Sequence, residues 1–536
     1  MCIRDSYWDA FNQVSTPGGN RYPDANAELN RTVESGILVM NYLGHGGSLG
    51  WSQERVLNVS DINNWTNFNR LPLIITATCS FTGFDDASIT SAGEHSILNP
   101  IGGAVALFTT VRSVYASQNF RLTSAVYDNL FQQENGQFRT IGEILRISKN
   151  QVSLTNINAR KFLLIGDPSM TLAYPRHQVM TTQINGEPIE TNRLDTVGAL
   201  DSVRLSGMVS IDGLTPDQSF NGVMDITIYD KSTTVRTLQN DERSRIREFD
   251  LFSNIIFKGA VPVESGRFEL NFIVPLDINF SPGQAKISYY TQGEDLLDAG
   301  GVYDNLVIGG SSDNPIVDDS GPNIQAWMNS RSFVNGDRIN SDPLLIVDLL
   351  DESGINLSQV AIGHEITAII DGNTQNTIIL NDFFSSGSGF NTTSGTATFQ
   401  INDLEPGPHT IEIRAFDIAN NLSSIEIYFT VDQALNNAFL SFMVNPTPSN
   451  GPVSLNATHS IDNVISAAFQ IYDMQGRLIQ RIDAGGPFVG NEITYDGIIG
   501  ADISIINDGA YLCRAIVEVS DGSIIRSEFK KMVVLK

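Results

Sequence analysis

The sequence predicts a multidomain α/β plus all-β chain, in which one α/β domain precedes three β-sandwich modules. At 536 residues the chain is too long for one core, because single hydrophobic cores stop growing at roughly 250–300 residues. Between residues 37 and 173, short apolar runs alternate with helical periodicity, which is typical of an α/β layer with a largely parallel sheet. Beyond Tyr174, period-two strands separated by Gly, Asn, Asp and Pro indicate Ig-like β-sandwiches.

Four continuous apolar runs predict the buried strands of the α/β domain, residues 1–175. They are ILVMNYL (37–43), LPLIITATC (71–79), GGAVALFTTV (102–111) and KFLLIGDP (161–168). Continuous runs, as opposed to alternating ones, are expected where helices cover both faces of a sheet. Two amphipathic helices are expected between the last two runs, with apolar faces formed by Leu122, Val126 and Leu130 and by Ile141, Ile144, Leu145 and Val152.

Polar breaks divide the rest of the chain into modules at 176–315, 316–432 and 433–536. GGSSDNPIVDDSGP (309–322) is typical of a linker, and NPTPSNG (445–451) marks a further boundary. Each module contains clear strands, among them NGVMDITIYD in the first, GPHTIEIRAFDIANN in the second and GAYLCRAIVEVSDG in the third.

Composition excludes several classes of protein. The net charge of −27 argues against a nucleic-acid partner, whose phosphates would be repelled. No run of about 18 apolar residues and no signal peptide is present. Cys2, Cys79 and Cys513 lie too far apart in sequence for a disulfide framework or a C-x-x-C metal site. The opening MCIRDS contains no recognisable targeting signal or helix-capping pattern, so we expect an incomplete chain.

The second module offers one candidate metal site, while no catalytic cofactor is expected. Five acidic residues there supply the hard oxygen ligands that calcium prefers. The alternative is a set of solvated acidic turns, because the D-x-[DN]-x-[DN]-G loop is absent. The candidate ligands of this structural calcium are Asp318, Asp319, Asp348, Asp351 and Glu352.

Two residues with catalytic chemistry each lie just past the carboxyl end of a predicted buried strand. His45 stands between glycines in NYLGHGG (41–47), and Cys79 comes 34 positions later. In open α/β sheets, ligands and catalytic groups collect at that edge. A nearby histidine can take the thiol proton or stabilise the thiolate, so the pair predicts a cysteine nucleophile. The flanking glycines permit a tight turn and leave the Gly46 amide, together with the Cys79 amide, free to form an oxyanion hole.

Each of these residues also has a structural interpretation. Taken alone, Cys79 fits a buried cysteine that ends a strand, and His45 fits a turn residue without a role. Asp85 and Asp86, near Cys79, either touch a substrate or begin the next helix, and the sequence favours the helix.

The other histidines are expected to be structural. His95 competes with His45 for the catalytic role, but it stands beside Glu94 at a predicted helix start. The remaining four are expected on the surface or in turns: His177, His364, His409 and His459.

NYLGHGG followed by LPLIITATCSFTGFDD resembles the catalytic half of the gingipain-type cysteine peptidases, family C25 of the caspase-like clan. SAGEHSILNPIGGAVALFTTVRSVY (91–115) and FLLIGDPSMTLAYP (162–175) follow in the family's order and spacing. The resemblance is detailed over about 40–175 and architectural over 176–536. It is most specific to the family members that act as signal peptidases and sortases in type IX secretion.

The resemblance implies a caspase-like catalytic domain with a His45–Cys79 dyad. It implies an enzyme at the cell surface, associated with the outer membrane, that removes C-terminal sorting domains from secreted proteins. It also implies an outer-membrane β-barrel partner and anionic lipopolysaccharide as acceptor of the new carboxyl end. Hydrolysis and transfer use the same residues up to the acyl-enzyme, so the sequence leaves both open.

One departure from the family pattern concerns the acid that orients the histidine. The family carries it well upstream, and only 44 residues precede His45. Asp9, Asp24 and Glu28 are available, and the sequence favours none of them. We therefore expect an N-terminally truncated catalytic domain.

Two rival functions stay open. The last module, from NPTPSNGPVSL to KKMVVLK, is similar to the sorting domains that type IX cargo carries, which favours a secreted cargo protease. A non-catalytic surface scaffold would instead bind partners through the β modules. The presence of both His45 and Cys79 argues against the scaffold, because an inactive domain has no physical reason to retain both.

Overall fold

The structure is a computed structural model of the chain. It describes residues 7–134, 136–152, 156–189, 195–240, 244–293, 297–386, 393–436, 439–447, 453–461, 464–484, 492–497, 509–519 and 523–534. These residues form two compact units. The first, the α/β unit, comprises the described residues of 7–174 and 235–249; the second, the β unit, comprises the described residues of 175–234 and from 250 onward.

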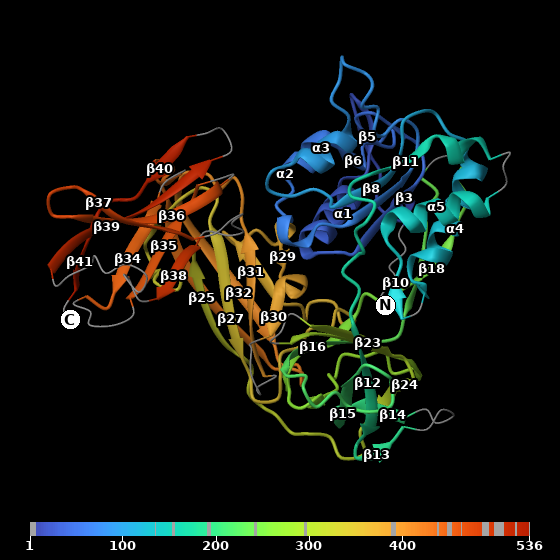
Figure 1. Cartoon of the computed structure of the whole chain (residues 1–536). Coiled ribbons are helices and arrows are strands. Elements are labelled where there is room, and N and C mark those ends of the chain that lie inside the picture. Colours follow the sequence, from blue (N-terminus) through green and yellow to red (C-terminus); the bar gives the residue numbers. More distant parts are fainter. Residues whose placement is uncertain are drawn as a thin grey trace. The chain divides into compact units, whose positions relative to one another are not determined.

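A four-stranded sheet in the order β11-β8-β7-β3 forms the centre of the α/β unit (Figure 1). β3 (Val39–Leu43), β7 (Leu73–Ala77) and β8 (Ala106–Thr110) run parallel, and β11 (Phe162–Ile165) pairs antiparallel with β8 at the edge. All four predicted runs therefore form strands, and the sheet is largely parallel as expected. The reversed direction of β11 was not indicated by the sequence.

Helices cover both faces of this sheet. Leu73 and Ile75 of β7 pack in one cluster with helices α4 and α5, whereas Ile74 packs in another with helices α1, α2 and α3. Successive strand side chains point to opposite faces, so a strand covered on both sides must be apolar along most of its length. Accordingly, every residue of β7 and β8 is buried.

The α/β unit contains further elements around the sheet. Its helices are η1 (Trp8–Ala10), α1 (Pro23–Ser35), α2 (Val59–Asn64), η2 (Phe68–Arg70), α3 (Ala92–Leu98), α4 (Ala116–Leu130), α5 (Ile141–Gln151) and η3 (Ile157–Arg160). Its short strands are β1 (Val14–Thr16), β2 (Gly19–Arg21), β4 (Gly46–Gly47), β5 (Gly50–Trp51), β6 (Leu57–Asn58), β9 (Gln133–Glu134) and β10 (Gln137–Phe138). The two predicted helices correspond to α4 and α5.

The first β module is built from a large sheet in the order β19-β16-β22-β23-β12-β15-β20, with β13 beside β12, and a small sheet in the order β14-β24-β21. Residues of both sheets share one hydrophobic core. The strands are β12 (His177–Ile184), β13 (Glu187–Pro188), β14 (Asp195–Ala199), β15 (Ser202–Ser210), β16 (Gly222–Tyr229), β19 (Ile255–Val263), β20 (Arg267–Ile273), β21 (Gly283–Gln284), β22 (Lys286–Gly293), β23 (Asp298–Tyr303) and β24 (Leu306–Ser311).

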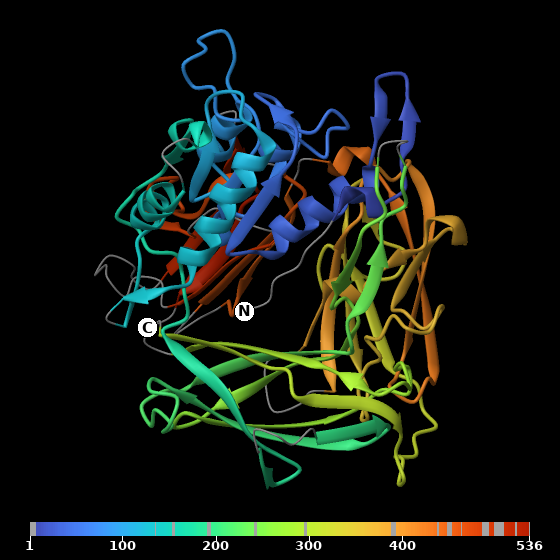
Figure 2. The ribbon, with the colours of Figure 1, turned by 90° about the vertical axis from the view of Figure 1, so that its right-hand side faces the viewer.

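The second β module packs a four-stranded sheet, β25-β27-β31-β30, against a five-stranded one, β26-β33-β32-β28-β29. Figure 2 shows its long strands, yellow to orange, side by side. The elements are β25 (Asn323–Met328), β26 (Arg338–Ile339), β27 (Leu344–Leu350), β28 (Thr367–Ile370), η4 (Thr374–Asn376), β29 (Ile378–Ile379), η5 (Asn381–Phe383), β30 (Phe384–Ser386), β31 (Ser394–Gln400), β32 (Gly407–Phe416) and β33 (Leu422–Val431).

The third β module has sheets β34-β35-β38 and β37-β36-β39-β40, with β41 also paired to β39, around a third core. Its elements are η6 (Gln433–Leu435), β34 (Phe439–Asn445), β35 (Val453–His459), β36 (Val464–Asp473), β37 (Leu478–Asp483), β38 (Glu492–Gly497), β39 (Gly509–Val519), β40 (Ile524–Arg526) and β41 (Lys530–Val534). The three modules are thus sheet pairs around separate cores. Their immunoglobulin-like class stays a prediction.

One segment of the first β module belongs to the α/β unit. The hairpin of β17 (Thr233–Arg236) and β18 (Glu248–Leu251) carries Val235–Phe249 into that unit. There the Leu238 amide donates to the Asp9 carbonyl at 2.7 Å, and the Asn240 amide donates to the Asp9 carboxylate at 3.0 Å. The sequence did not indicate this excursion.

Among the described helices, none combines the length and apolar character needed to cross a membrane.

Candidate active site

The parallel pairing of β3 with β7 places the two predicted catalytic residues at the same edge of the sheet. Val39 pairs with Leu73 and Leu43 with Ala77 along the whole ladder. The same register brings His45 and Cys79, each two residues beyond its strand, to matching positions at the carboxyl ends. Neighbouring strands lie about 4.8 Å apart, so the two residues leave the sheet side by side.

The main chain of His45 is fixed from two directions. Its carbonyl accepts hydrogen bonds from the Tyr42 hydroxyl at 2.7 Å and from the Ser52 amide at 2.8 Å. The Tyr42 ring stacks on Trp51 with centroids 4.3 Å apart. The His45 side chain is exposed, and within the described residues no hydrogen bond joins it to another group. Two hydrogen bonds therefore hold the main chain at His45, while its imidazole is exposed.

Tyr42 stays a hydrogen-bond donor over the working pH range. Burial raises the pKa of its hydroxyl, and the negative charge of Glu54 raises it further. A protonated hydroxyl keeps its bond to the His45 carbonyl. Sequence reasoning missed Tyr42, because its place in an apolar run indicates only a core side chain.

Gly46 allows the turn after His45 to approach the end of β7. A Cβ at this position would lie 2.6 Å from Thr78 Oγ1 and 2.8 Å from the carbonyl oxygen of Gly50, so no other residue fits without displacement. The Ser52 amide reaches the His45 carbonyl, so the next amide along the strand, that of Gly46, faces away from β5. This orientation is compatible with the predicted oxyanion role, which stays a prediction, as does that of the Cys79 amide.

Cys79 is half-buried, and its thiol contacts the loop that follows β8. The Val114 amide lies 3.4 Å from Sγ and donates to it, while the Val114 carbonyl lies 3.9 Å away. The sulfur therefore lies against the main chain of this loop. Because Val114 contributes only its main chain, no sequence signal could identify it. Within the described residues no hydrogen bond joins Cys79 to His45, although such bonds are often longer or absent before substrate binds.

Buried polar groups hold the strand ends beneath this site. The Thr110 hydroxyl donates to the Thr78 carbonyl, and Asn119 Nδ2 donates to the Ala77 carbonyl at 2.9 Å. Asn158 in turn donates to Asn119 at 2.7 Å. These bonds fix the direction in which the chain leaves β7, and hence the position of Cys79.

No candidate for the orienting acid is joined to His45. Asp9 accepts from Asn240, and Glu28 pairs with Arg31 at 2.8 Å. Asp24 lies in the first turn of α1. The identity of the acid stays open, as the sequence left it.

The helix expected at Asp85 and Asp86 does not form. Asp85 pairs with Arg112, and Asp86 accepts hydrogen bonds from the amide and hydroxyl of Ser88. Helix α3 begins later, at Ala92, where Ser91 and Glu94 form a capping box. The carboxylates are held by these local partners in exposed turns, so the prediction of a helix start was wrong.

The other cysteine that the structure describes has the opposite environment. Cys513 lies in the third module with its Sγ 3.9 Å from Met532 Sδ, and burial raises the pKa of its thiol to about 12. It is therefore unsuited to nucleophilic chemistry. Cys2 lies outside the described residues.

The prediction that the four remaining histidines lie on the surface or in turns was wrong for two of them. His177 is 6% exposed and bonded to Asp217 at 3.0 Å, and His459 is 2% exposed. Each lies on a strand facing a core. His364 and His409 are partly buried.

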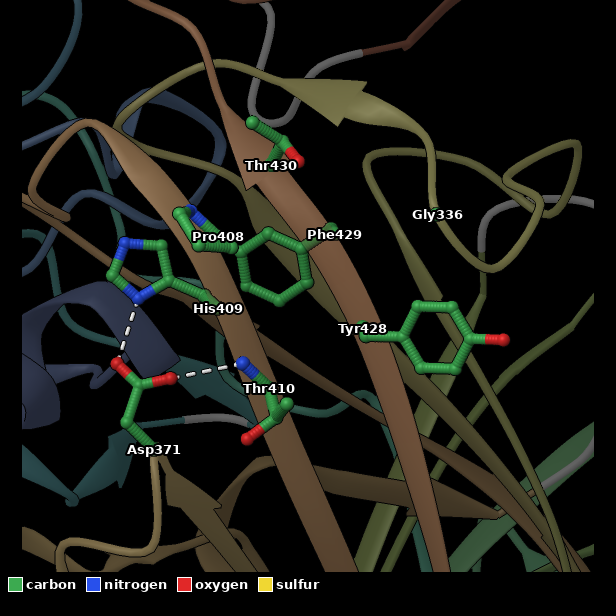
Figure 3. A pocket seen from close by; sticks show the side chains of 8 residues that line it. All are labelled: Gly336, Asp371, Pro408, His409, Thr410, Tyr428, Phe429 and Thr430. Carbon is green, nitrogen blue, oxygen red and sulfur yellow. Dashed lines mark hydrogen bonds and ion pairs between the residues drawn. The ribbon is translucent and has the colours of Figure 1, made fainter.

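A shallow pocket in the second β module holds His409 but none of the predicted catalytic residues (Figure 3). His409 Nδ1 lies 2.7 Å from Asp371, and Nε2 lies 2.7 Å from the Glu405 carbonyl. Both ring nitrogens are therefore occupied by structural partners.

Comparisons with known proteins confirm the resemblance inferred from the sequence. Residues 1–173 match the model of peptidase family C25. Among solved structures, dimeric latent PorU from Porphyromonas gingivalis is 27% identical, with 98% of this chain and 47% of that chain covered and a TM-score of 0.35. The complex of the RgpB pro- and mature domains, also from Porphyromonas gingivalis, is 15% identical over 53% of this chain and 57% of that one, with a TM-score of 0.26. The chain thus spans about half the length of the PorU structure. No curated protein matches this chain.

Proposed function

We propose, from the match of residues 1–173 to peptidase family C25, that the chain carries the catalytic centre of a cysteine endopeptidase with His45 and Cys79 as its dyad. The observation that carries this proposal is the β3–β7 register, which brings the two residues to one sheet edge. The half-buried thiol with a main-chain donor adds support.

In the proposed reaction the Cys79 sulfur attacks the carbonyl carbon of the scissile peptide. His45 takes the thiol proton and passes it to the leaving amine, so that the C–N bond breaks as the thioester remains. The Gly46 and Cys79 amides hold the oxyanion of the tetrahedral intermediate. Water then attacks the thioester, which releases the new carboxyl end and restores the thiol.

The substrate we propose is a secreted protein that carries a C-terminal sorting domain. The resemblance of the quoted motifs to type IX sortases supports this choice, as does the similarity to PorU. If an amine of anionic lipopolysaccharide replaces water, the same thioester delivers the product to that glycan. The proposal places the protein at the cell surface, beside an outer-membrane β-barrel partner.

The test is cleavage of a cargo protein with its sorting domain by the full-length parent of this chain. We expect Cys79→Ala and His45→Ala to abolish release of the domain, because each removes one half of the dyad. Mass spectrometry of the new carboxyl end would show a free acid after hydrolysis and a glycan adduct after transfer.

Two variants serve as controls. Cys513→Ala removes a buried thiol and His95→Gln removes the competing histidine, and both should leave cleavage intact. If Cys79→Ala cleaves as fast as the parent, the dyad is refuted. If neither the parent nor the variants cleave, the non-catalytic scaffold function is favoured instead. If the parent removes its own last module during secretion, the cargo-protease function is favoured instead.

A further inference from the structure

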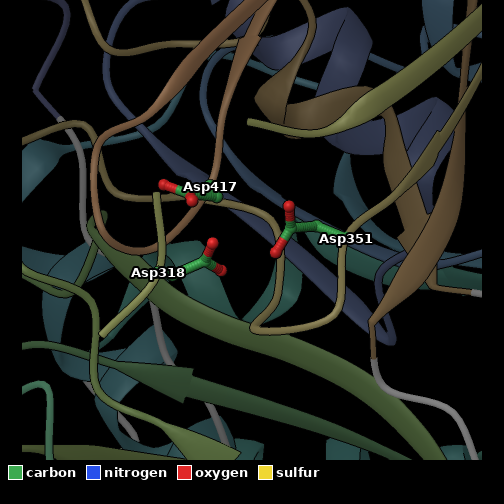
Figure 4. A group of neighbouring side chains, drawn as sticks. All are labelled: Asp318, Asp351 and Asp417. Carbon is green, nitrogen blue, oxygen red and sulfur yellow. The ribbon is translucent and has the colours of Figure 1, made fainter. Parts of the chain in front are cut away.

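Three aspartates from three separate loops of the second β module face one another. Asp318 lies in the linker before β25, Asp351 follows β27, and Asp417 follows β32. One carboxylate oxygen of each lies within 4.8 Å of those of the other two. Figure 4 shows Asp318 and Asp351 turning oxygens toward one another, with Asp417 beside them. This group is called the aspartate cluster below.

The aspartate cluster includes only two of the five residues that the sequence offers as calcium ligands. Asp348 is engaged elsewhere, in an ion pair with Arg331 at 2.8 Å. Asp319 and Glu352 are exposed. Asp417 had no sequence signal, because its approach to Asp351 depends on how the turn between β32 and β33 packs beside the loop after β27.

The cluster concentrates negative charge away from water. Asp417 is fully buried and Asp351 is 6% exposed. Within the described part of the chain, no lysine, arginine or histidine forms an ion pair with any of the three. Buried carboxylates of this kind require a compensating cation or a proton.

Carboxylate oxygens in the cluster lack hydrogen-bond partners. Asp318 Oδ2 is shielded from solvent and accepts no hydrogen bond. All three bonds that Asp351 accepts, from the Ser353 amide and hydroxyl and the Gly354 amide, end on its Oδ1. Its Oδ2 therefore remains available, although the side chain is more than nine-tenths buried. Buried carboxylate oxygens without a hydrogen-bond partner indicate a site for a cation.

We propose that the aspartate cluster binds one calcium ion. Because the three oxygens lie within 4.8 Å of one another, they are close enough to bind one ion together, and calcium forms bonds of about 2.3–2.6 Å to such oxygens in flexible geometry. Magnesium suits a group of several carboxylates less well, because it demands near-ideal octahedral geometry and gives up its water ligands reluctantly. Water and main-chain carbonyls complete the coordination shell.

The bound ion would link the linker to a turn that contacts the first β module. Asn421 Nδ2 already joins the Asp318 carbonyl, at 2.8 Å, to the Asp417 carboxylate, at 2.7 Å. In the same turn, the Ile418 carbonyl accepts from the Leu276 amide at 2.8 Å. Calcium at the cluster therefore stabilises both the linker and the main-chain contact between the two modules.

The experiment measures calcium binding and thermal unfolding of the full chain. After treatment with a chelator, titration calorimetry with calcium chloride should give one site per chain. Calcium at about 1 mM, the range used by extracellular modules, should raise the Tm of the transition that includes the second module. Magnesium at the same concentration should not reproduce the rise. Absence of calcium binding, or an equal rise with magnesium, overturns the proposal.

Variants distinguish a calcium site from a cluster with a merely structural role. Asp351→Asn and Asp417→Asn should both abolish the calcium-dependent rise in Tm. In chelator, Asp351→Asn should be at least as stable as the parent, because a repelling charge has been removed and its Oδ1 can still accept all three hydrogen bonds. Asp319→Asn changes the same charge one residue from Asp318 on an exposed side chain, and it should keep the full rise. Variants that are equally destabilised with and without calcium would refute the site.

Hydrogen exchange gives a local readout that does not depend on overall stability. Calcium should slow amide exchange in residues 318–320 and 417–421 of the parent and of Asp319→Asn, but not of Asp417→Asn. If exchange in these segments is the same with calcium and with chelator in the parent, the ion does not bind there.

Discussion

At the scale of single residues, the site depends on a glycine that a larger side chain cannot replace. A Cβ added at Gly46 would lie within 3 Å of both the Thr78 hydroxyl and the Gly50 carbonyl oxygen. A hydroxyl can rotate away, but the carbonyl belongs to the main chain of β5 and cannot. Any added Cβ must therefore push the turn, and His45 with it, away from β7.

We expect Gly46→Ala to lower kcat/KM for peptide cleavage by about a hundredfold, because displacements near 1 Å cost about this much when reacting groups must align. Overpacking should also cost roughly 1–3 kcal/mol of unfolding free energy. The measurement is steady-state cleavage of a fluorogenic peptide by the full-length parent, together with its Tm.

Gly47→Ala is the matched control, since a Cβ at Gly47 meets nothing within 4 Å. It should keep the activity of the parent. Equal loss of activity in both variants would show that the turn needs flexibility, and that close packing on Thr78 is not the cause.

Residues with a reactive side chain next to a predicted strand could be identified from the sequence. Residues that contribute only because folding places them beside the site could not. His45 and Cys79 stood out because each follows an apolar run. Val114 acts through its main chain, and Asp417 acts through a neighbour brought close by folding. Neither leaves a sequence pattern, because the interaction partner is distant along the chain.

At the scale of elements, the hairpin segment Val235–Phe249 is attached to the α/β unit by polar contacts that a variant can test. Asn240 Nδ2 donates to the Phe11 carbonyl at 2.9 Å, in addition to the main-chain bonds with Asp9. Asn240→Ala should cost about 1 kcal/mol of local stability, the usual loss for one hydrogen bond. Hydrogen exchange of residues 236–240 should accelerate accordingly.

The exposed Asn63 in helix α2 provides the control. Asn63→Ala should leave exchange in 236–240 unchanged. If Asn240→Ala also leaves it unchanged, the Leu238 and Asn240 amides alone hold the segment.

Element type was more predictable than element direction or connection. The apolar runs of β7 and β8 are covered on both faces, and that of β3 is as long although Asn41 and Leu43 are exposed, so all three runs indicate strands. The direction of β11 depends on the chain's path around α4 and α5, which no local pattern encodes. Asp85 and Asp86 do not begin a helix, because Asp85 forms an ion pair with Arg112 and Asp86 forms an Asx turn with Ser88.

At the scale of the whole molecule, we expect several unfolding transitions, because the α/β unit and the three β modules have separate hydrophobic cores. The chain length and the change from helical to period-two patterning predicted several separate cores. They did not predict that Val235–Phe249 belongs to the α/β unit, because this depends on contacts between residues far apart in the sequence. All four tryptophans, Trp8, Trp51, Trp65 and Trp327, precede the third module. Tryptophan fluorescence therefore does not report the unfolding of that module.

The third module should lose stability in mild acid because it buries a neutral histidine. His459 lies on β35 with its Nδ1 accepting from the Ile461 amide at 3.1 Å, and burial lowers the pKa of its imidazole to about 4. In the unfolded chain the pKa is about 6.5. Since the folded pKa is the lower one, the stabilisation is fully present above pH 6.5 and is lost as the pH falls toward 4, on the order of 3 kcal/mol in total.

Cys513 supplies the measurement, because its thiol is fully buried in the core of the same module. In a background with Cys2→Ser and Cys79→Ser, Cys513 is the one thiol left to label. Its labelling by a thiol-disulfide exchange reagent, corrected for the intrinsic pH dependence of thiolate reactivity, should show opening that increases between pH 6.5 and 4.5. His459→Gln should remove most of this increase. The matched variant is His409→Gln: although burial lowers its pKa, the bonds to Glu405 and Asp371 raise it overall, so its stabilisation is lost as pH rises instead. Equal acid sensitivity of parent and His459→Gln would show that carboxylates, and not His459, control the stability of the third module in acid.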